Sequence, residues 1–317
     1  MRIIVTGATG FVGQALLERL LEDGHEISAA VRQAVALRAP THVVGDIDTT
    51  TEWRESLEGV DCVVHLAARV HRLNDRIADP LKAYRETNTR GTLRLAQSAA
   101  DAGAKRFVFL SSAKVLGESS PLGGFNDAST PSQQDPYSVS KWEAEQALHD
   151  LCKASGMELC ILRPPLVYGP GVRANFLRLL HWVDRGYPLP FGAVRNRRSL
   201  IALGNLVDAI AICTTHPAAG ETFLVSDGED LSTPELIRRL ATQLQKPARL
   251  LNVSPALLRM VGSVTGRSAE IDRLLGDFHV DSTRIRELLT WNPPYSVNQA
   301  LGETVAWYRD QRTLEKR

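Results

Sequence analysis

Residues 2–13 read RIIVTGATGFVG, and this stretch decides the fold. Its opening run, RIIVT, is short, apolar and β-branched, as expected of a buried strand in a parallel sheet. The run from Phe11 onward, FVGQALLERLLE, repeats apolar side chains at helical spacing. Three glycines stand between the strand and the body of the helix: Gly7, Gly10 and Gly13. The stretch therefore predicts a strand, a tight turn and a helix, the opening unit of an α/β fold.

Strands and helices continue to alternate up to about residue 165. Apolar runs predict strands at 2–6, 26–32, 42–46, 61–68, 106–110 and 157–163. Helical periodicity predicts helices at 11–22, 80–102 and 136–155. This order is typical of a Rossmann doubly wound parallel sheet, so we predict that residues 1–165 form a dinucleotide-binding domain.

Beyond residue 165 the alternation loosens, and Pro and Gly cluster at 164–171 and 186–192. Short helices are predicted near 175–185, 205–215, 233–244, 254–265 and 296–309, with one strand near 222–225. We predict that residues 166–317 form a smaller, mostly helical C-terminal lobe for the substrate, on the carboxyl edge of the sheet. Some of its segments are expected to return to the main domain.

The charges of the chain nearly cancel, with 37 basic and 36 acidic side chains among 317 residues. This balance offers no overall field for nucleic acid or an anionic membrane. No stretch approaches the ~18 apolar residues of a membrane span, and no signal peptide precedes the first strand. We expect a cytoplasmic protein with no nucleic-acid partner and no membrane span.

Cysteine and histidine patterns indicate neither disulfides nor a metal site. The four cysteines form no C-x-x-C pair and are expected to be small buried residues in a reducing compartment. The eight histidines lack H-x-x-x-H or H-E-x-x-H spacing, so no metal is predicted.

The spacing G-x-x-G-x-x-G indicates dinucleotide binding, because it follows a strand and opens a helix. Gly7 permits the tight turn, Gly10 lets the backbone approach a pyrophosphate, and Gly13 lets the helix pack against the sheet. The N–H groups and dipole of the helix then attract the anion. The alternative is a plain strand-to-helix turn, which would not need three glycines at this spacing.

The residue at the end of the second predicted strand indicates whether the adenosine ribose carries a 2′-hydroxyl or a 2′-phosphate. A carboxylate there would accept a hydrogen bond from the 2′-hydroxyl of NAD, but the sequence AAVRQ has Arg32 and no adjacent acid. A guanidinium suits a 2′-phosphate, which favours NADP(H) over NAD(H), unless Arg32 is a solvated surface residue. Asp46 and Ile47, after the third strand, are expected to flank the adenine.

Residues 135–148, DPYSVSKWEAEQAL, place a tyrosine on the first turn of a helix and a lysine four residues later. Residues four apart share a helix face, so Tyr137 and Lys141 are expected side by side. They are either packing residues or a phenol with an ammonium that keeps its proton labile. Ser111 and Ser112 follow the fifth predicted strand, at the edge where open α/β sheets bind ligands.

Together these segments resemble the extended short-chain dehydrogenase/reductases, the NAD-dependent epimerase/dehydratase family of nucleotide-sugar enzymes. The resemblance runs from residue 1 to about residue 310 and is specific in the order and spacing of its motifs. The motifs are TGATGFVG (6–13), HLAA (65–68), N-x-x-GT (88–92), SSAKVLG (111–117), YSVSK (137–141) and LRPPLVYGPG (162–171).

The resemblance implies a catalytic set of Ser112, Tyr137, Lys141 and Asn88. Tyr137 would be the general acid/base, with its pKa lowered by Lys141 and by the positive nicotinamide. Lys141 would also bind the nicotinamide ribose, Ser112 would orient the reacting oxygen, and Asn88 would support a proton path. The expected cofactor contacts are Gly7, Thr9, Gly10, Phe11, Val12, Gly13, Arg32, Asp46, Ile47, Leu66, Ala67, Ala68, Tyr137, Lys141 and Pro164.

The chain departs from several relatives within this superfamily. Nucleotide-sugar dehydratases carry Asp-Glu after the catalytic Ser or Thr, whereas this chain has Ala113 and Lys114, so dehydration is not expected. UDP-sugar 4-epimerases have an asparagine after the sixth strand, where this chain has Leu166. The chain is more similar to a UDP-glucose 4-epimerase-like subgroup that includes 4-keto reductases of O-antigen sugar synthesis.

The residues predicted to bind the nucleotide sugar are Lys114, Asn175, Arg198 and Arg273. Lys114 is either a solvated loop residue or a cation facing the sugar or its diphosphate. The resemblance implies that Asn175 touches the diphosphate, Arg198 the phosphate or ribose, and Arg273 a second phosphate position. One short basic cluster on a neutral chain does not indicate nucleic acid.

The sequence favours an NADPH-dependent 4-keto reductase of a UDP-sugar, because of Arg32, Leu166 and the subgroup resemblance. The alternative is a 4-epimerase, which oxidises C4, rotates the keto intermediate and returns the hydride. A third hypothesis is a non-catalytic, cofactor-sensing protein of this fold, against which the intact Ser112, Tyr137 and Lys141 argue. The resemblance also implies a homodimer built on helices 80–102 and 136–155.

Overall fold

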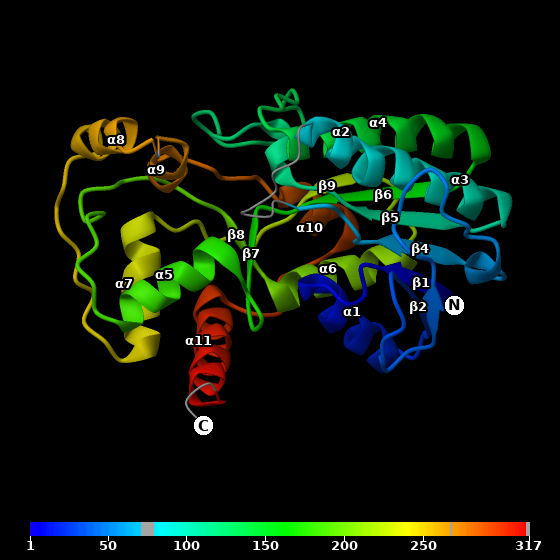
Figure 1. Ribbon diagram of the computed structural model, residues 1–317, viewed down its shortest axis with the longest axis horizontal. Coiled ribbons are helices and arrows are strands. Elements are labelled where there is room, and N and C mark those ends of the chain that lie inside the picture. The colour runs from blue at the N-terminus through cyan, green and yellow to red at the C-terminus, as the bar shows by residue number, and fades with distance from the viewer. Residues whose placement is uncertain (71–78, 267, 315–317) are drawn as a thin grey trace.

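A seven-stranded parallel sheet forms the centre of the molecule (Figure 1). The computed structural model describes residues 1–70, 79–266 and 268–314. The strand order is β3-β2-β1-β4-β5-β6-β9, and the neighbouring strands are parallel. The strands are β1 (Arg2–Thr6), β2 (Glu26–Val31), β3 (Thr41–Val43), β4 (Cys62–His65), β5 (Arg106–Leu110), β6 (Glu158–Arg163) and β9 (Thr222–Leu224). The predicted α/β fold with a doubly wound parallel sheet is confirmed.

Helices cover both faces of the sheet (Figure 1). In that view α2, α3 and α4 lie above it, and α1 and α6 pack together below it. The helices are α1 (Phe11–Glu22), α2 (Pro80–Tyr84), α3 (Thr92–Asp101), α4 (Pro136–Ser155) and α6 (Leu203–Thr215). Two short 3-10 helices, η1 (Glu55–Leu57) and η3 (Ala113–Leu116), follow the strands β3 and β5. Because the helices lie on the two faces, the carboxyl ends of the strands are left for a ligand.

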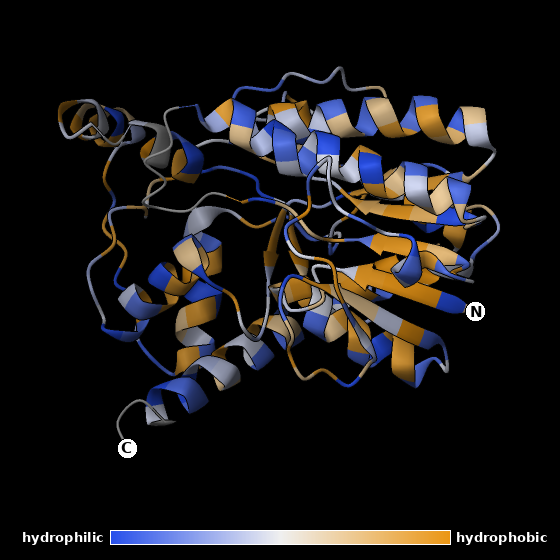
Figure 2. Ribbon diagram, turned by 45° about the vertical axis from the view of Figure 1, so that its right-hand side comes forward, coloured by the Kyte–Doolittle hydropathy of each residue, from blue (hydrophilic) through white to orange (hydrophobic). Residues whose placement is uncertain are grey.

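The strands are apolar along their length, as Figure 2 shows by their orange colour between helices that carry blue. Val63, Phe107 and Ile161 are fully buried on one face, and Val64, Val108 and Cys160 on the other. Each large apolar side chain buried in this way contributes about 1.5–3 kcal/mol. The continuous apolar runs of the sequence follow from this burial on both faces.

A second group of elements forms a lobe beside the sheet, at the left of Figure 1. Its apolar core includes Phe176, Leu240 and Leu301, from three different helices. The lobe contains β7 (Leu166–Tyr168), β8 (Leu200–Ala202), α5 (Ala174–Asp184), α7 (Thr233–Leu244), α8 (Pro255–Val264), α9 (Ser268–Leu275) and α11 (Val297–Leu314). The strand β9 leaves this region and pairs with β6, and α10 (Thr283–Leu289) packs on β9.

Several predicted boundaries differ from the observed ones. The predicted strand 42–46 is β3 and ends at Val43, before Gly45 takes a φ of +75°. The predicted strand 61–68 is β4 and ends at His65, and residues 66–70 form no regular secondary structure. The predicted helix 80–102 contains a π-helical turn, η2 (Arg85–Gly91). Four short elements of the lobe and its return to the sheet were not predicted: β7, β8, α9 and α10.

All four cysteines are buried and free, which confirms that they are packing residues. Among the described residues, no helix is both long and apolar enough to cross a membrane.

Candidate active site

The turn between β1 and α1 exposes bare backbone at the carboxyl edge of the sheet. Gly7 has a φ of +70°, and a Cβ there would lie 2.7 Å from the backbone nitrogen of Ala67. A Cβ on Gly13 would lie 2.2 Å from the Gly7 oxygen, and one on Gly10 3.0 Å from the same atom. Gly7 and Gly13 accept no side chain without a shift of the backbone. The turn therefore keeps a backbone-lined cradle at the start of α1.

The N-terminus of α1 is suited to an anion. In this fully described helix, Gly10 is an N-cap without a side-chain cap, and the first turn carries no acidic residue. The first N–H groups of a helix have no partner within it, and its dipole favours negative charge. The cradle and this helix end fit the pyrophosphate of a dinucleotide, and Thr9, Phe11 and Val12 belong to the same turn.

Arg32 is paired at the end of β2. Its Nε lies 2.6 Å from Oδ1 of Asp46, and both side chains are exposed. The sequence indicated no acid beside Arg32, but the pairing of β2 with β3 brings Asp46 to it from the segment that follows β3. Arg32 is therefore not a free cation, and a 2′-phosphate would compete with Asp46 for it. The next residue, Ile47, packs closely against Gly91.

Asn88 connects the end of β4 to α4. Its Oδ1 accepts a hydrogen bond from the Arg69 N–H (2.7 Å), and its Nδ2 donates to Ser140 Oγ (3.0 Å). Ser140 Oγ in turn donates to the carbonyl oxygen of Tyr137 (2.8 Å). Asn88 lies within the π-helical turn η2, a geometry frequent at functional sites. The loop of Leu66, Ala67 and Ala68 is thus tied to the helix that carries Tyr137 and Lys141.

Ser112 lies where β5 ends and η3 begins. Its Oγ accepts a hydrogen bond from the Lys114 N–H (3.2 Å), so it caps η3. The next residue, Ala113, donates its N–H to the carbonyl oxygen of Pro164 (2.9 Å). The chain after β5 is therefore fixed against the chain after β6, at the same edge as the glycine turn.

Asp135 determines where α4 begins. Its Oδ1 accepts a hydrogen bond from the Ser138 N–H (2.9 Å), and the Asp135 N–H donates to Ser138 Oγ (3.3 Å). Pro136 occupies the first helical position, where its missing N–H costs nothing. This capping box places Tyr137 on the first turn, with its ring edge-on to Tyr84 at a centroid distance of 6.2 Å.

The two ionisable groups of the predicted catalytic pair are both perturbed by burial. Burial, with the charge of Asp135 and the neighbouring Tyr84, raises the pKa of Tyr137 above its ordinary value. The lowering implied by the family resemblance relied on a bound nicotinamide as well as on Lys141, and it stays a prediction. Burial also lowers the pKa of Lys141 to about 7, although Glu145 opposes the shift. Burial thus disfavours the charged form of Lys141, the form that would support a phenolate.

Lys141 is held by an aromatic ring. Its side chain is only 1% exposed, and Nζ lies 3.9 Å from the ring centroid of Phe109, on β5. A buried ammonium over a ring gains cation–π energy that offsets part of its desolvation. The lysine is therefore oriented by β5 as well as by its own helix.

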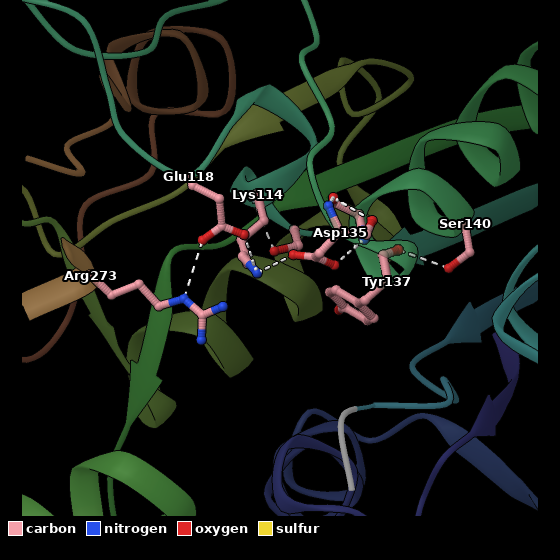
Figure 3. Close-up of polar contacts among 8 residues, drawn as sticks. Lys114, Glu118, Asp135, Tyr137, Ser140 and Arg273 are labelled. Carbon is pink, nitrogen blue, oxygen red and sulfur yellow. Dashed lines mark hydrogen bonds and ion pairs between the residues drawn. The ribbon is translucent and has the colours of Figure 1, made fainter. Parts of the chain in front are cut away.

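Four charged side chains lie in series beside Tyr137 (Figure 3), and we call them the charged cluster: Arg273, Glu118, Lys114 and Asp135. Arg273 Nε lies 3.4 Å from Glu118 Oε2, and Lys114 Nζ lies 2.7 Å from Glu118 Oε1. Lys114 Nζ also contacts the Asp135 carboxylate. Burial opposes ionisation of Asp135, but its contacts with Glu118 and Lys114 and the hydrogen bond from Ser138 lower its pKa to about 2.

The structure brings together some, but not all, of the residues predicted to bind the substrate. The Lys114 side chain is only partly exposed, and two carboxylates contact its ammonium. A guanidinium nitrogen of Arg198 donates to the carbonyl oxygens of Arg273 (2.6 Å) and Gly276 (3.1 Å). Asn175 contacts its own helix, where its Oδ1 accepts a hydrogen bond from Arg178 (2.6 Å). The structure thus links Lys114, Arg273 and Arg198 through contacts but gives no such link to Asn175 among the described residues.

Sequence analysis missed three residues that shape this site. Asp135 and Glu118 belong to the charged cluster, and the dipeptide Asp-Pro before the helix was a readable capping signal. Glu145 is completely buried and accepts hydrogen bonds from Ser111 Oγ and from Arg163 (Nε 3.1 Å). It follows Lys141 by four residues, so it lies on the same face of α4. That spacing was the available signal.

The sheet, the glycine cradle and the polar set at its edge define a class, the Rossmann-fold oxidoreductases of the short-chain dehydrogenase/reductase type. The chain belongs to the NAD dependent epimerase/dehydratase family, whose model matches residues 3–226. It is therefore an enzyme of the extended branch of that superfamily.

Individual relatives agree with this assignment. A UDP-glucose 4-epimerase of Vibrio cholerae is 45% identical over 95% of this chain and 94% of its own length. The NAD-bound dTDP-glucose 4,6-dehydratase DesIV of Streptomyces venezuelae superposes with a TM-score of 0.79 at 26% identity, covering 99% of this chain and 98% of its own. The UDP-glucuronic acid 4-epimerase of Bacillus cereus, in complex with NAD, has a TM-score of 0.79 at 21% identity, with coverages of 98% and 99%. This last likeness shows the fold.

Proposed function

We propose that the protein is an NAD-dependent 4-epimerase of a UDP-hexose. The observation that carries the proposal is the 45% identity, over nearly the whole chain, to a UDP-glucose 4-epimerase. The sequence placed a 4-keto reductase ahead of an epimerase, and this relative reverses that order. Ala113 and Lys114 stand where the family's dehydratases carry Asp-Glu, which supports epimerisation over dehydration.

In this proposal the chain's own residues bind, orient and move a proton. Tyr137 accepts the proton of the sugar C4 hydroxyl and returns it after the keto group has been reduced. Ser112, fixed between β5 and η3, orients the same oxygen. Lys141 and Asn88 hold the Tyr137 segment of α4 through Phe109 and Ser140. When bound, the nicotinamide supplies the site that accepts and returns hydride.

The proposed cofactor is NAD(H). The guanidinium of Arg32 already forms an ion pair with Asp46. It is therefore less available to a 2′-phosphate than the sequence indicated. A carboxylate in this neighbourhood is suited to the ribose hydroxyls. NADP(H), which the sequence favoured, is the alternative and would require Asp46 to release Arg32.

A 4-keto reductase is the second candidate, and one residue favours it. Leu166 begins β7 and is 46% exposed, in the position where the family's UDP-sugar 4-epimerases have an asparagine. An apolar side chain there offers no hydrogen bond to a sugar. A reductase would use Tyr137 to donate one proton and would release its oxidised cofactor after each turnover.

The nucleotide carried by the purified protein distinguishes the two candidates. We expect denatured protein to release NAD⁺ in nearly equimolar amount, because an epimerase closes its redox cycle on one cofactor molecule. Absorbance and mass spectrometry identify the released nucleotide. Protein that is empty and then binds NADPH more tightly than NADH would contradict the epimerase and support the reductase.

We also propose that the protein is a homodimer. Helices α3 and α4 pack side by side on one face of the sheet, as the expected four-helix interface requires. Light scattering at micromolar concentration should give twice the chain mass of 34.8 kDa. A monomer at that concentration would refute the dimer. The cytoplasmic location stays a prediction.

A further inference from the structure

The charged cluster joins three parts of the chain around the first turn of α4 (Figure 3). Arg273 comes from α9 in the lobe, Glu118 and Lys114 come from the segment after β5, and Asp135 is the N-cap of α4. Glu118 touches both Arg273 and Lys114, and Lys114 touches both carboxylates. Two cations and two anions therefore balance, and the cluster as a whole is neutral.

We propose that Lys114 is a positioning residue that neutralises Asp135 and thereby sets the proton affinity of Tyr137. The inference rests on the proposed function, because it takes Tyr137 as the group that exchanges the proton. It assigns Lys114 a role different from both alternatives that the sequence left open, a solvated loop residue and a cation facing the sugar or its diphosphate.

The geometry gives Lys114 little freedom for another role. Its side chain is 28% exposed and that of Asp135 only 14%, so their ion pair is partly shielded from water. Asp135 cannot move away, because its other oxygen caps α4. The ammonium has three N–H donors and contacts two carboxylates, so a substrate phosphate would have to share Lys114 with both of them. An ammonium held between two carboxylates therefore acts mainly on its fixed neighbours.

Few other charges of residues 1–70, 79–266 and 268–314 act on Tyr137. Asp135 precedes it at the N-cap, and Tyr84 approaches from α2. The guanidinium of Arg69 lies over the Tyr84 ring at 5.9 Å, and Lys141 follows on the next turn of α4. Within the described part of the chain, the other charges that contact Asp135 or its partners are Lys114, Glu118 and Arg273. Among these neighbours, Asp135 is the anion that raises the pKa of Tyr137. Neutralising its charge therefore has the largest effect on that pKa.

Removing the Lys114 charge would leave a net negative charge beside the phenol. A unit charge several ångströms away in a partly buried setting shifts a pKa by about one unit. We expect Lys114→Met to move the apparent pKa of Tyr137 upward by about that amount. In the direction of C4 oxidation the active form is the phenolate, so the rising limb of the pH–rate profile moves to higher pH.

Asp135→Asn should have the opposite effect. It removes the anion that destabilises the phenolate, and asparagine caps helices as well as aspartate does, so α4 should remain intact. The apparent pKa should fall by about one unit. The double variant Lys114→Met/Asp135→Asn removes one charge of each sign and should return the pKa close to the wild-type value. Arg284→Met is the matched control, because it removes one cation from an ion pair with Glu221 that does not face Tyr137.

Two readouts separate this inference from the proposed function. The first is the pH profile of kcat and KM with UDP-glucose as probe. The second is the near-ultraviolet absorbance of tyrosinate during titration, taken as the difference between each variant and its Tyr137→Phe counterpart, which needs no turnover. The inference is supported if the apparent pKa of Tyr137 rises in Lys114→Met, falls in Asp135→Asn and returns close to the wild-type value in the double variant. A raised KM for UDP-glucose in Lys114→Met with an unshifted tyrosinate titration would overturn it and identify Lys114 as a substrate contact.

Discussion

Replacing Tyr137 by phenylalanine is expected to lower turnover of the UDP-sugar about a thousandfold while cofactor binding persists. A positioned general acid/base contributes about 10²–10⁴-fold to rate, and this change removes only the hydroxyl. The ring can keep its edge-on contact with Tyr84, and the cap of α4 does not involve Tyr137. Turnover is measured as formation of the C4 epimer from UDP-glucose, with bound nucleotide quantified on the same samples.

Tyr187→Phe is the matched control, because this tyrosine is 47% exposed in the segment after α5. It should turn over like the wild-type protein. If Tyr137→Phe also kept wild-type turnover, the catalytic assignment would be wrong. If neither the wild-type protein nor the variants converted any sugar while all bound cofactor, the non-catalytic, cofactor-sensing hypothesis would gain support.

Replacing Glu145 by alanine should cost about 3–5 kcal/mol of unfolding free energy. Glu145 is completely buried and its partner Arg163 is only 11% exposed, with Nη2 of the arginine 2.5 Å from Oε2. Removing one member of a buried pair leaves the other charge without compensation. The same carboxylate accepts the hydroxyl of Ser111, which would lose its partner. Urea unfolding, with the midpoint and slope fitted together, measures the loss.

Glu221→Ala is the control for Glu145→Ala, since Glu221 forms an ion pair with Arg284 in which both side chains are about two-fifths exposed. Exposed pairs contribute about 0–1 kcal/mol, so the control should unfold near the wild-type midpoint. If both variants lost the same free energy of unfolding, burial of the Glu145–Arg163 pair would not be the reason that it stabilises the packing of α4 on β5 and β6.

The local parts of the fold and site could be predicted because short stretches of sequence determine them. The three glycines of the first turn and the apolar run before them predicted β1 and α1 with their observed bounds. The bounds of α4, residues 136–155, followed from helical periodicity. These signals act within one or two turns of chain, where spacing alone determines which groups meet.

The parts that could not be predicted depend on which distant segments pack together. Asp46 reaches Arg32 only because β3 pairs with β2. The charged cluster needs Arg273, which lies far along the chain from Lys114 and Glu118. The raised pKa of Tyr137 arises from burial, which a helix pattern does not quantify. The strands β7 and β8 have three residues each, too few for a period to be visible.

The return of β9 to the sheet has a consequence for the nascent chain. The chain leaves the sheet after β6, builds β7, α5, β8 and α6, and only then adds β9 beside β6. While the ribosome has released residues only through β6, one side of β6 pairs with β5, but the side that later pairs with β9 faces no strand. Unpaired strand edges attract other chains, and incompletely folded intermediates aggregate through them. Folding of the sheet is therefore expected to be completed only after translation has passed residue 224, and a fragment that ends at residue 165 should aggregate.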